Sequence, residues 1–241
     1  MNDNVQIGIY GKLPAYGDFI YRNLDSTFIH PWDEWLQHYI SGSREQLGEN
    51  WEEIYLTSPI WRFALSAGVV DDRVWAGLMM PSVDKVGRYF PISIVVPLAK
   101  SVSPVNVLAA QDAWFNHLET HCLDALGGEL DADELFEATS QVEFQPYDYY
   151  EPTFHLGESG SMVIGLKSSN EDAFKHVLPY VLNSRLNAEL SSFSLWQTTG
   201  SDRMSPVIFC CQGLPSLSGL ASMLDGQWQK RNWKIPYTPR T

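Results

Sequence analysis

Cysteine is scarce in this sequence, and long uninterrupted apolar runs are missing. Only three Cys occur in 241 residues, Cys122, Cys210 and Cys211, and no two of them form a C-x-x-C pair. A bridge between adjacent cysteines would be strained, so we expect buried free thiols in a reducing compartment. No apolar run approaches the ~20 residues that a membrane-spanning helix needs. The polar start, residues 1–4, has no basic segment followed by an apolar one. We therefore expect a cytoplasmic protein without direct membrane insertion.

Positive charge is also in short supply. The chain has 16 Lys and Arg against 29 Asp and Glu, which gives a formal net charge of −13. Such a chain repels phosphate backbones and anionic lipids, which argues against nucleic acid and membrane surfaces as partners. Residues 101–166 contain no Lys or Arg at all. This stretch is either a solvated acidic flank or a docking face for a basic patch on a partner protein.

The residues that are abundant indicate a large aromatic core. Hydrophobic residues make up 44% of the chain and charged residues only 19%, and there are nine Trp. Alternating apolar positions, bounded by Gly and Pro, predict strands at residues 5–9, 60–65, 74–80, 90–96, 161–166, 192–198 and 206–211. Helical spacing predicts helices from Pro31 to about Gly48 and at 103–127, 131–139, 171–186 and 217–224. Residues 11–18, 81–89, 145–153 and 199–202 are expected to be loops.

This order of elements predicts an α/β (α+β) fold. Strands at 60–96 can pair locally through the hairpin loop at 81–89, which indicates an antiparallel component. Helices fall between the groups of strands, which favours layers around one sheet. We expect residues 1–241 to form a single layered domain, with a mixed, partly antiparallel central sheet flanked by helices.

Lys12 lies in a glycine-containing loop that partly resembles a phosphate-binding loop. That motif places Ser or Thr after the lysine and uses consecutive backbone N–H groups to hold the phosphate. Here Leu13 follows Lys12, and Pro14 lacks an N–H group. A turn held by glycines is the favoured interpretation, and a nucleotide-dependent enzyme that uses the Lys12 loop is an alternative.

His117 and His121 are four residues apart on a predicted helix and could share a zinc ion. Glu119 lies between them, so the motif is H-x-E-x-H and not the H-E-x-x-H of zinc proteases. No third ligand is marked by its spacing. Two ordinary helix histidines are the simpler interpretation, and a metal-dependent enzyme remains the alternative.

A group of charged residues lies in and near two predicted loops and forms the candidate interaction surface. Its members are Lys12, Asp18, Arg22, Arg62, Asp84, Lys85 and Arg88. Asp often caps turns and Arg often pairs with Asp or packs on Trp, so a structural role is one interpretation. The other is a polar binding surface where the two loops meet. Spacing alone does not separate the two.

Several motifs in this order resemble the TagF (ImpM) family of type VI secretion. Residues 8–20, GIYGKLPAYGDFI, are similar to the family's opening G-x-x-G-K-L-P-x-x-G-D-F. Further blocks are PWDEWLQ at 31–37, YLTSPIWRF at 55–63, PSVDKVGRYFP at 81–91, SLW at 194–196 and GLP at 213–215. The most specific motifs fall in residues 1–97. One departure is Leu195-Trp196, where the family has a Trp-Trp pair.

The resemblance implies a cytoplasmic accessory protein that regulates type VI secretion after translation, with repression as the expected output. It implies a forkhead-associated scaffold protein as partner, no cofactor or metal, and no catalytic residues. The matched Gly, Pro and Trp are expected to hold the fold, whereas Lys12, Asp18, Arg62, Asp84 and Arg88 are the polar exceptions. A structural subunit of the secretion baseplate is a further alternative to the regulator.

Overall fold

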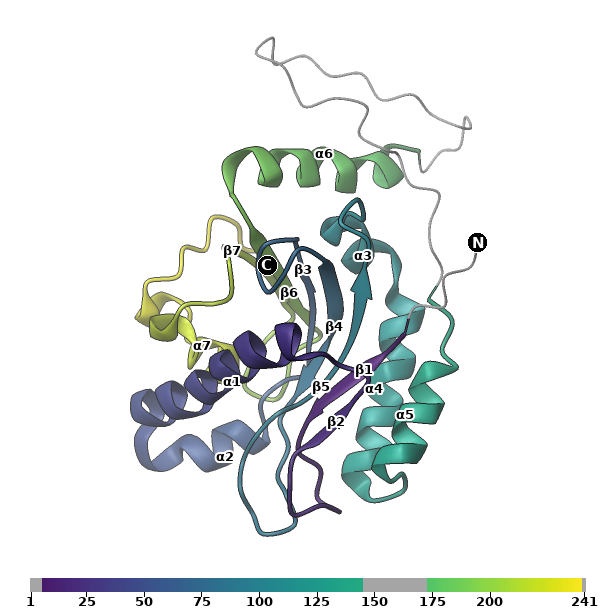
Figure 1. Ribbon diagram of the computed structural model, residues 1–241. Helices are drawn as coiled ribbons and strands as arrows, with labels where there is room; N and C mark the ends of the chain where they lie inside the picture. The colour runs from purple at the N-terminus through teal and green to yellow at the C-terminus, as the bar shows by residue number, and fades with distance from the viewer. Residues whose placement is uncertain (1–5, 145–172, 240–241) are drawn as a thin grey trace.

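A seven-stranded sheet runs through the middle of the molecule (Figure 1). The computed structural model describes residues 6–144 and 173–239. The strands lie in the order β2-β1-β5-β4-β3-β6-β7. They are β1 (Gly8–Gly11), β2 (Ile20–Arg22), β3 (Trp61–Leu65), β4 (Val74–Met80), β5 (Ile92–Leu98), β6 (Phe193–Thr198) and β7 (Val207–Gln212). Every pairing between these strands is antiparallel.

Helices cover both faces of the sheet, which gives three layers. One face carries α1 (Ser26–Leu47), α2 (Trp51–Leu56) and α7 (Ser222–Asp225), with short 3-10 turns at Gly48–Asn50, Leu217–Gly219 and Gln229–Arg231. The other face carries α3 (Pro104–Ala110), α4 (Asp112–Gly127) and α5 (Ala132–Ser140), and α6 (Ala173–Glu189) packs against α3. Figure 1 shows α1 and α2 apart from α4 and α5, with the strands between them.

Aromatic rings fill the layer between the sheet and α1. The rings of Trp32 and Trp196 stack in parallel with centroids 6.3 Å apart, and the Phe63 ring packs against both, at 4.9 and 5.0 Å. The indole N–H of Trp32 donates to Ser93 Oγ at 3.1 Å, and that of Trp61 donates to the Met223 carbonyl at 3.0 Å. Buried indoles stabilise a core through their large apolar area, and their N–H groups usually find an acceptor, as those of Trp32 and Trp61 do.

The first helix begins earlier than its apolar spacing predicts. Asp25 precedes α1, and its side chain accepts hydrogen bonds from the backbone N–H groups of Thr27 and Phe28. This N-cap satisfies donors that a helix start leaves unpaired, so α1 starts at Ser26 and contains Pro31 in its interior. Its end agrees with the prediction, because Gly48 follows the last helical residue with φ 61°.

The predicted α/β class with helices around a sheet is confirmed. The sheet is antiparallel in all its described pairings, whereas we expected a mixed sheet. The helix expected at 103–127 is divided at Gln111, whose φ of −107° and ψ of 29° are not helical. The short elements β2 and α2 were not predicted. The loop expected at 145–153 and the strand expected at 161–166 lie outside the described residues.

Candidate functional site

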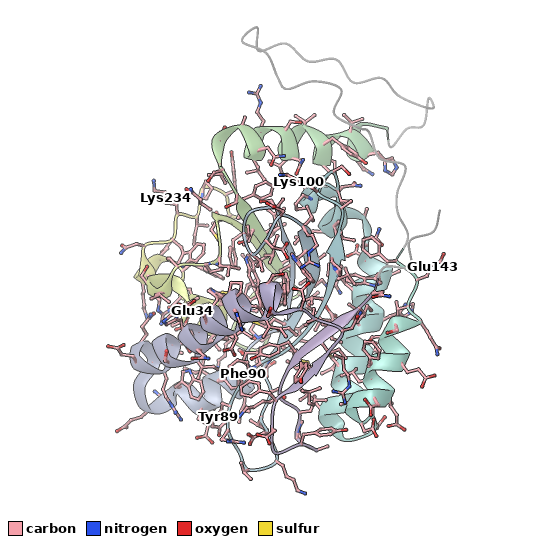
Figure 2. All side chains as sticks on the ribbon, viewed as in Figure 1. Glu34, Tyr89, Phe90, Lys100, Glu143 and Lys234 are labelled. Carbon is pink, nitrogen blue, oxygen red and sulfur yellow. The ribbon has the colours of Figure 1, made fainter. Side chains whose placement is uncertain are left out.

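Two loops that carry specific sequence motifs meet at one end of the sheet. One connects β1 to β2 through residues 12–19, and the other connects β4 to β5 through residues 81–91. Figure 1 shows both connections at the lower end of the sheet, and Figure 2 labels Tyr89 and Phe90 there. The register explains this meeting, because β1 pairs directly with β5 and the loop after Gly11 starts where that ladder ends, at the pair Tyr10↔Ser93.

An ion pair joins the two loops. The Nζ of Lys12 donates to Oδ2 of Asp84 at 2.8 Å, and the side chains are 6% and 0% exposed. The Phe19 ring covers the ammonium group, which lies 4.9 Å from the ring centroid. Removing one partner of a buried ion pair leaves the other as an uncompensated charge, which is strongly destabilising. The Lys12–Asp84 pair therefore ties the two loops together.

Asp84 also organises its own loop. Its carboxylate accepts from the backbone N–H groups of Val86 and Arg88 at 3.0 and 2.9 Å, and from Nε of Arg88 at 2.6 Å. Burial raises the pKa of this carboxyl, but the hydrogen bonds from Lys12 and from Arg88 outweigh it, and the pKa lies well below its usual range. Asp84 is therefore ionised at neutral pH and works as a structural anion.

Main-chain contacts complete the link. The N–H of Lys85 donates to the Tyr16 carbonyl at 2.8 Å, and the Arg88 guanidinium donates to the Gly17 carbonyl. The Ser82 hydroxyl donates to the Lys12 carbonyl at 2.7 Å. With the Lys12–Asp84 pair, seven residues from the two loops thus hold one another in place, which is the arrangement a preorganised binding surface needs.

The outer rim of this joined structure is exposed and mixed in character. Val86 is 70% exposed and Phe19 is 43% exposed, while Asp18 and Lys85 are also exposed. The Arg88 side chain is 57% exposed although its Nε contacts Asp84. We call the surface formed by Asp18, Phe19, Lys85, Val86 and Arg88 the loop face. It presents apolar and charged groups on a rigid support.

The structure brings some of the sequence-derived candidates together and separates others. Lys12, Asp84 and Arg88 are in contact, and Asp18 and Lys85 lie beside them in the same two loops. Arg62 lies elsewhere, on β3, where it bonds Glu119 at 2.6 Å and Asn116 at 2.6 Å on α4. Arg22 on β2 pairs with Asp133 of α5 at 2.8 Å.

Sequence reasoning missed the apolar members of the loop face. Phe19 lies between Asp18 and Ile20, and Val86 lies between Lys85 and Gly87; neither belongs to a periodic pattern. Their exposure is visible only once the loops are folded. The signal that was available is the motif itself, because both residues lie inside the blocks 8–20 and 81–91.

The groups suggested for enzyme chemistry are not assembled. Lys12 is 5% exposed and bound to Asp84, so a phosphate would have to displace a carboxylate to reach it. His117 is exposed, and His121 has Asp124 at 3.9 Å as its partner. Among the residues that the structure describes, no group of three or more His, Cys, Asp or Glu could hold a metal ion. The described part of the chain also has no helix long and apolar enough to cross a membrane.

Comparison with known proteins defines the class. A family model described as the TagF N-terminal domain, type VI secretion system-associated, matches residues 8–142, which include both loops of the loop face. The chain therefore belongs to the TagF family of type VI secretion-associated proteins.

A solved relative extends the similarity over the whole chain. The crystal structure of PA0076 from Pseudomonas aeruginosa PAO1 is 30% identical, with a TM-score of 0.80. The match covers 98% of this chain and 100% of the relative. A search of curated proteins finds no match.

Proposed function

We propose that this protein is a cytoplasmic regulator of type VI secretion that represses the machine by binding a forkhead-associated scaffold protein through the loop face. Family membership supports a role among type VI secretion proteins. The observation that carries the binding role is the pair of loops held together by hydrogen bonds and by the buried Lys12–Asp84 ion pair, with an exposed rim. A rigid surface with apolar and charged anchors binds a partner at little entropic cost.

The residues to change are those at the rim. Lys12 and Asp84 hold the loops together, so their substitution would alter the stability of the fold as well as the binding surface. Lys85→Glu combined with Val86→Asp reverses a charge and removes an apolar anchor at exposed positions, which leaves the core untouched. Leu123→Asp is the matched control, because Leu123 is 53% exposed on α4 and belongs to neither loop.

The test is calorimetric titration of the purified protein with the purified forkhead-associated scaffold of the same organism. We expect the loop-face variant to bind at least about tenfold more weakly, while the Leu123→Asp variant binds like the native chain. Equal binding by both variants would remove the loop face from the proposal. Absence of binding by the native chain would remove the scaffold.

The output is measured in cells. A strain that lacks the protein should secrete more type VI substrate, and the loop-face variant should fail to restore repression at equal protein levels. Restoration by that variant contradicts the proposal. Stoichiometric co-purification with the assembled machine would favour a baseplate subunit instead. A thermal shift with ATP, GTP, magnesium or zinc would favour an enzyme, since a ligand at about 100 times Kd stabilises by about 2.7 kcal/mol.

A further inference from the structure

The last strand of the sheet is an unusual edge. β7 has the sequence VIFCCQ, which contains no charged residue, no Pro and no Gly. Its residues alternate between half-buried and exposed, and Ile208 on the exposed side is 61% accessible. Proteins normally protect such edges with charges, prolines, bulges or short strands. β7 has six residues and none of these devices in its sequence.

The outer side of β7 is open in the described part of the chain. Its ladder joins β6 from Thr198↔Val207 to Phe193↔Gln212. Among residues 6–144 and 173–239, no backbone hydrogen bond outside that ladder involves a residue of β7. The N–H and C=O groups that point away from β6 are thus available to another strand.

The opposite edge of the sheet differs. β2 has three residues, and its Arg22 is held by Asp133 of α5 at 2.8 Å. A strand this short offers few groups for pairing, and α5 covers it from one side. The two edges are therefore not equivalent, and β7 is the one suited to accept a strand.

Packing keeps β7 in a fixed shape. The Phe209 ring lies 5.4 Å from Trp61, 5.4 Å from Trp228 and 4.8 Å from Trp233, measured between centroids. One face of the strand is anchored in this aromatic group, while the other face presents Ile208 and Cys210. An incoming strand would meet an ordered template, which lowers the entropic cost of pairing.

Charge around β7 has the opposite sign to the rest of the molecule. Residues 193–239 contain four basic residues, Arg203, Lys230, Arg231 and Lys234, against the acidic Asp202 and Asp225. Arg203 pairs with Glu53 and Arg231 with Asp225, whereas Lys230 and Lys234 are exposed. These lysines adjoin the tryptophans on the Phe209 face, and Figure 2 labels Lys234 on the β7 side of the molecule.

We propose that β7 accepts an extended segment of a partner protein as an additional strand, with apolar side chains on one face and acidic side chains on the other. The apolar residues would lie beside Ile208 and Cys210, and the acidic residues would lie toward Lys230 and Lys234. Strand addition provides affinity through backbone hydrogen bonds and specificity through alternate side chains. This site is separate from the loop face and does not depend on the scaffold.

The probe is a fluorescein-labelled eight-residue peptide that alternates Val and Glu, measured by fluorescence anisotropy. We expect saturable binding to the native chain, and at least about tenfold weaker binding of the same peptide with Lys in place of Glu. A Val-Glu peptide with alternate backbone amides methylated should not bind, because methylation removes the donors. Hydrogen exchange should slow at residues 207–212 when the Val-Glu peptide is bound.

Two variants locate the site. Ile208→Lys should abolish binding while leaving the melting temperature unchanged, because the side chain is largely exposed. Tyr21→Lys is the matched control on the β2 edge, where Tyr21 is 62% exposed, and it should bind like the native chain. Both variants keep Trp61 and Phe209, so the aromatic support of β7 is intact.

Three results would overturn the proposal. The first is no binding of the Val-Glu peptide up to about 1 mM, where an interaction is worth about 4 kcal/mol. The second is that the Lys peptide binds the native chain as tightly as the Val-Glu peptide does, or that the Ile208→Lys variant binds the Val-Glu peptide as tightly as the native chain does. Either result would show non-specific adhesion. The third is a concentration-dependent dimer of the native chain in sedimentation that Ile208→Lys abolishes, since β7 would then pair with a second copy.

Discussion

The Nζ of Lys12 lies 2.8 Å from Oδ2 of Asp84, across 72 positions of sequence, and both side chains are withdrawn from solvent. The same carboxylate accepts two backbone N–H groups and the Arg88 guanidinium. This contact converts two loops into one rigid unit. The polar residues of the motif thus divide into an inner group that holds the loops and an outer group that is exposed to solvent.

Removing either partner of this pair should destabilise the protein, and Asp84 should matter more. Lys12→Met leaves Asp84 with Arg88 and two backbone donors, whereas Asp84→Asn weakens every one of these bonds. We expect Lys12→Met to lower the melting temperature by about 10 °C and Asp84→Asn to lower it further. Thermal unfolding followed by circular dichroism measures both.

Lys85→Met is the control for this experiment. Lys85 follows Asp84 in the same loop but is exposed, so its loss should change the melting temperature by less than about 2 °C. If Lys12→Met behaves like Lys85→Met, the buried ion pair is not what holds the loops together.

Acid should reduce the stability that the Asp84 carboxylate contributes to the folded protein. Its pKa lies below the usual carboxyl range when the protein is folded, because its hydrogen bonds outweigh burial. In the unfolded chain the pKa of this carboxyl is about 3.9. A lowered folded pKa stabilises the protein above the unfolded pKa, and that stabilisation is lost as the pH falls further. The difference in stability between the native chain and Asp84→Asn should therefore be constant from pH 7 to about 5 and shrink below about pH 4.

Urea unfolding at a series of pH values tests this dependence. A second comparison with Asp18→Asn separates the effect from general protonation, since Asp18 is exposed. A gap for Asp84→Asn that keeps its size down to pH 3 would contradict the role assigned to the carboxylate.

The sequence predicted the larger elements because their signals are local. Periodicity located β3, β4 and β5 within two residues of their observed bounds, and Gly48 marked the end of α1. It missed β2, because three residues carry no alternation, and it missed α2, whose apolar Trp51 and Tyr55 form only one turn. The break at Gln111 is not marked by a Gly or a Pro, so helical spacing alone did not reveal it.

The site could be predicted only in part for a similar reason. The motifs drew attention to Lys12, Asp84 and Arg88, and the structure places them in contact. Arg62 came from an equally marked block, yet it faces α4 because its strand position points into that layer. Alternation shows which residues share a face, but it does not show which helix covers that face.

Gly11 should be intolerant of any side chain. Its φ is +141°, and a Cβ there would lie 2.1 Å from the Pro91 carbonyl oxygen. The close approach of these backbones is what brings the two loops together. We expect Gly11→Ala to cost about 3 kcal/mol of unfolding free energy, through backbone strain and the clash with Pro91. Urea unfolding measures the loss.

Gly17 in the same motif provides the matched substitution. A Cβ at Gly17 would have no atom within 4 Å, so Gly17→Ala should change the free energy of unfolding by less than about 1 kcal/mol. Similar losses for both variants would mean that the motif glycines serve chain flexibility and not close approach.

Arg62 on β3 bonds Asp112, Asn116 and Glu119 of α4. The two acids differ in exposure, so their substitution should separate a stabilising contact from an incidental one. The Arg62 side chain is 5% exposed, that of Glu119 is 20% exposed and that of Asp112 is 72% exposed. An ion pair with an exposed acid contributes little because water and salt screen it, so Asp112→Ala should cost less than about 1 kcal/mol. Glu119→Ala leaves a buried guanidinium without its nearest anion and should cost about 2 kcal/mol.

Salt distinguishes these two contributions further. Raising the ionic strength should remove most of the Asp112 effect, whereas the Glu119 effect should persist because that pair is mostly withdrawn from solvent. Urea unfolding at low and high salt measures both. Equal costs for the two substitutions, or equal salt sensitivity, would show that burial does not set the strength of these pairs. In that case α4 would be held to β3 chiefly by other contacts, such as the cation–π contact of Phe115, whose ring centroid lies 5.3 Å from the guanidinium carbon of Arg62.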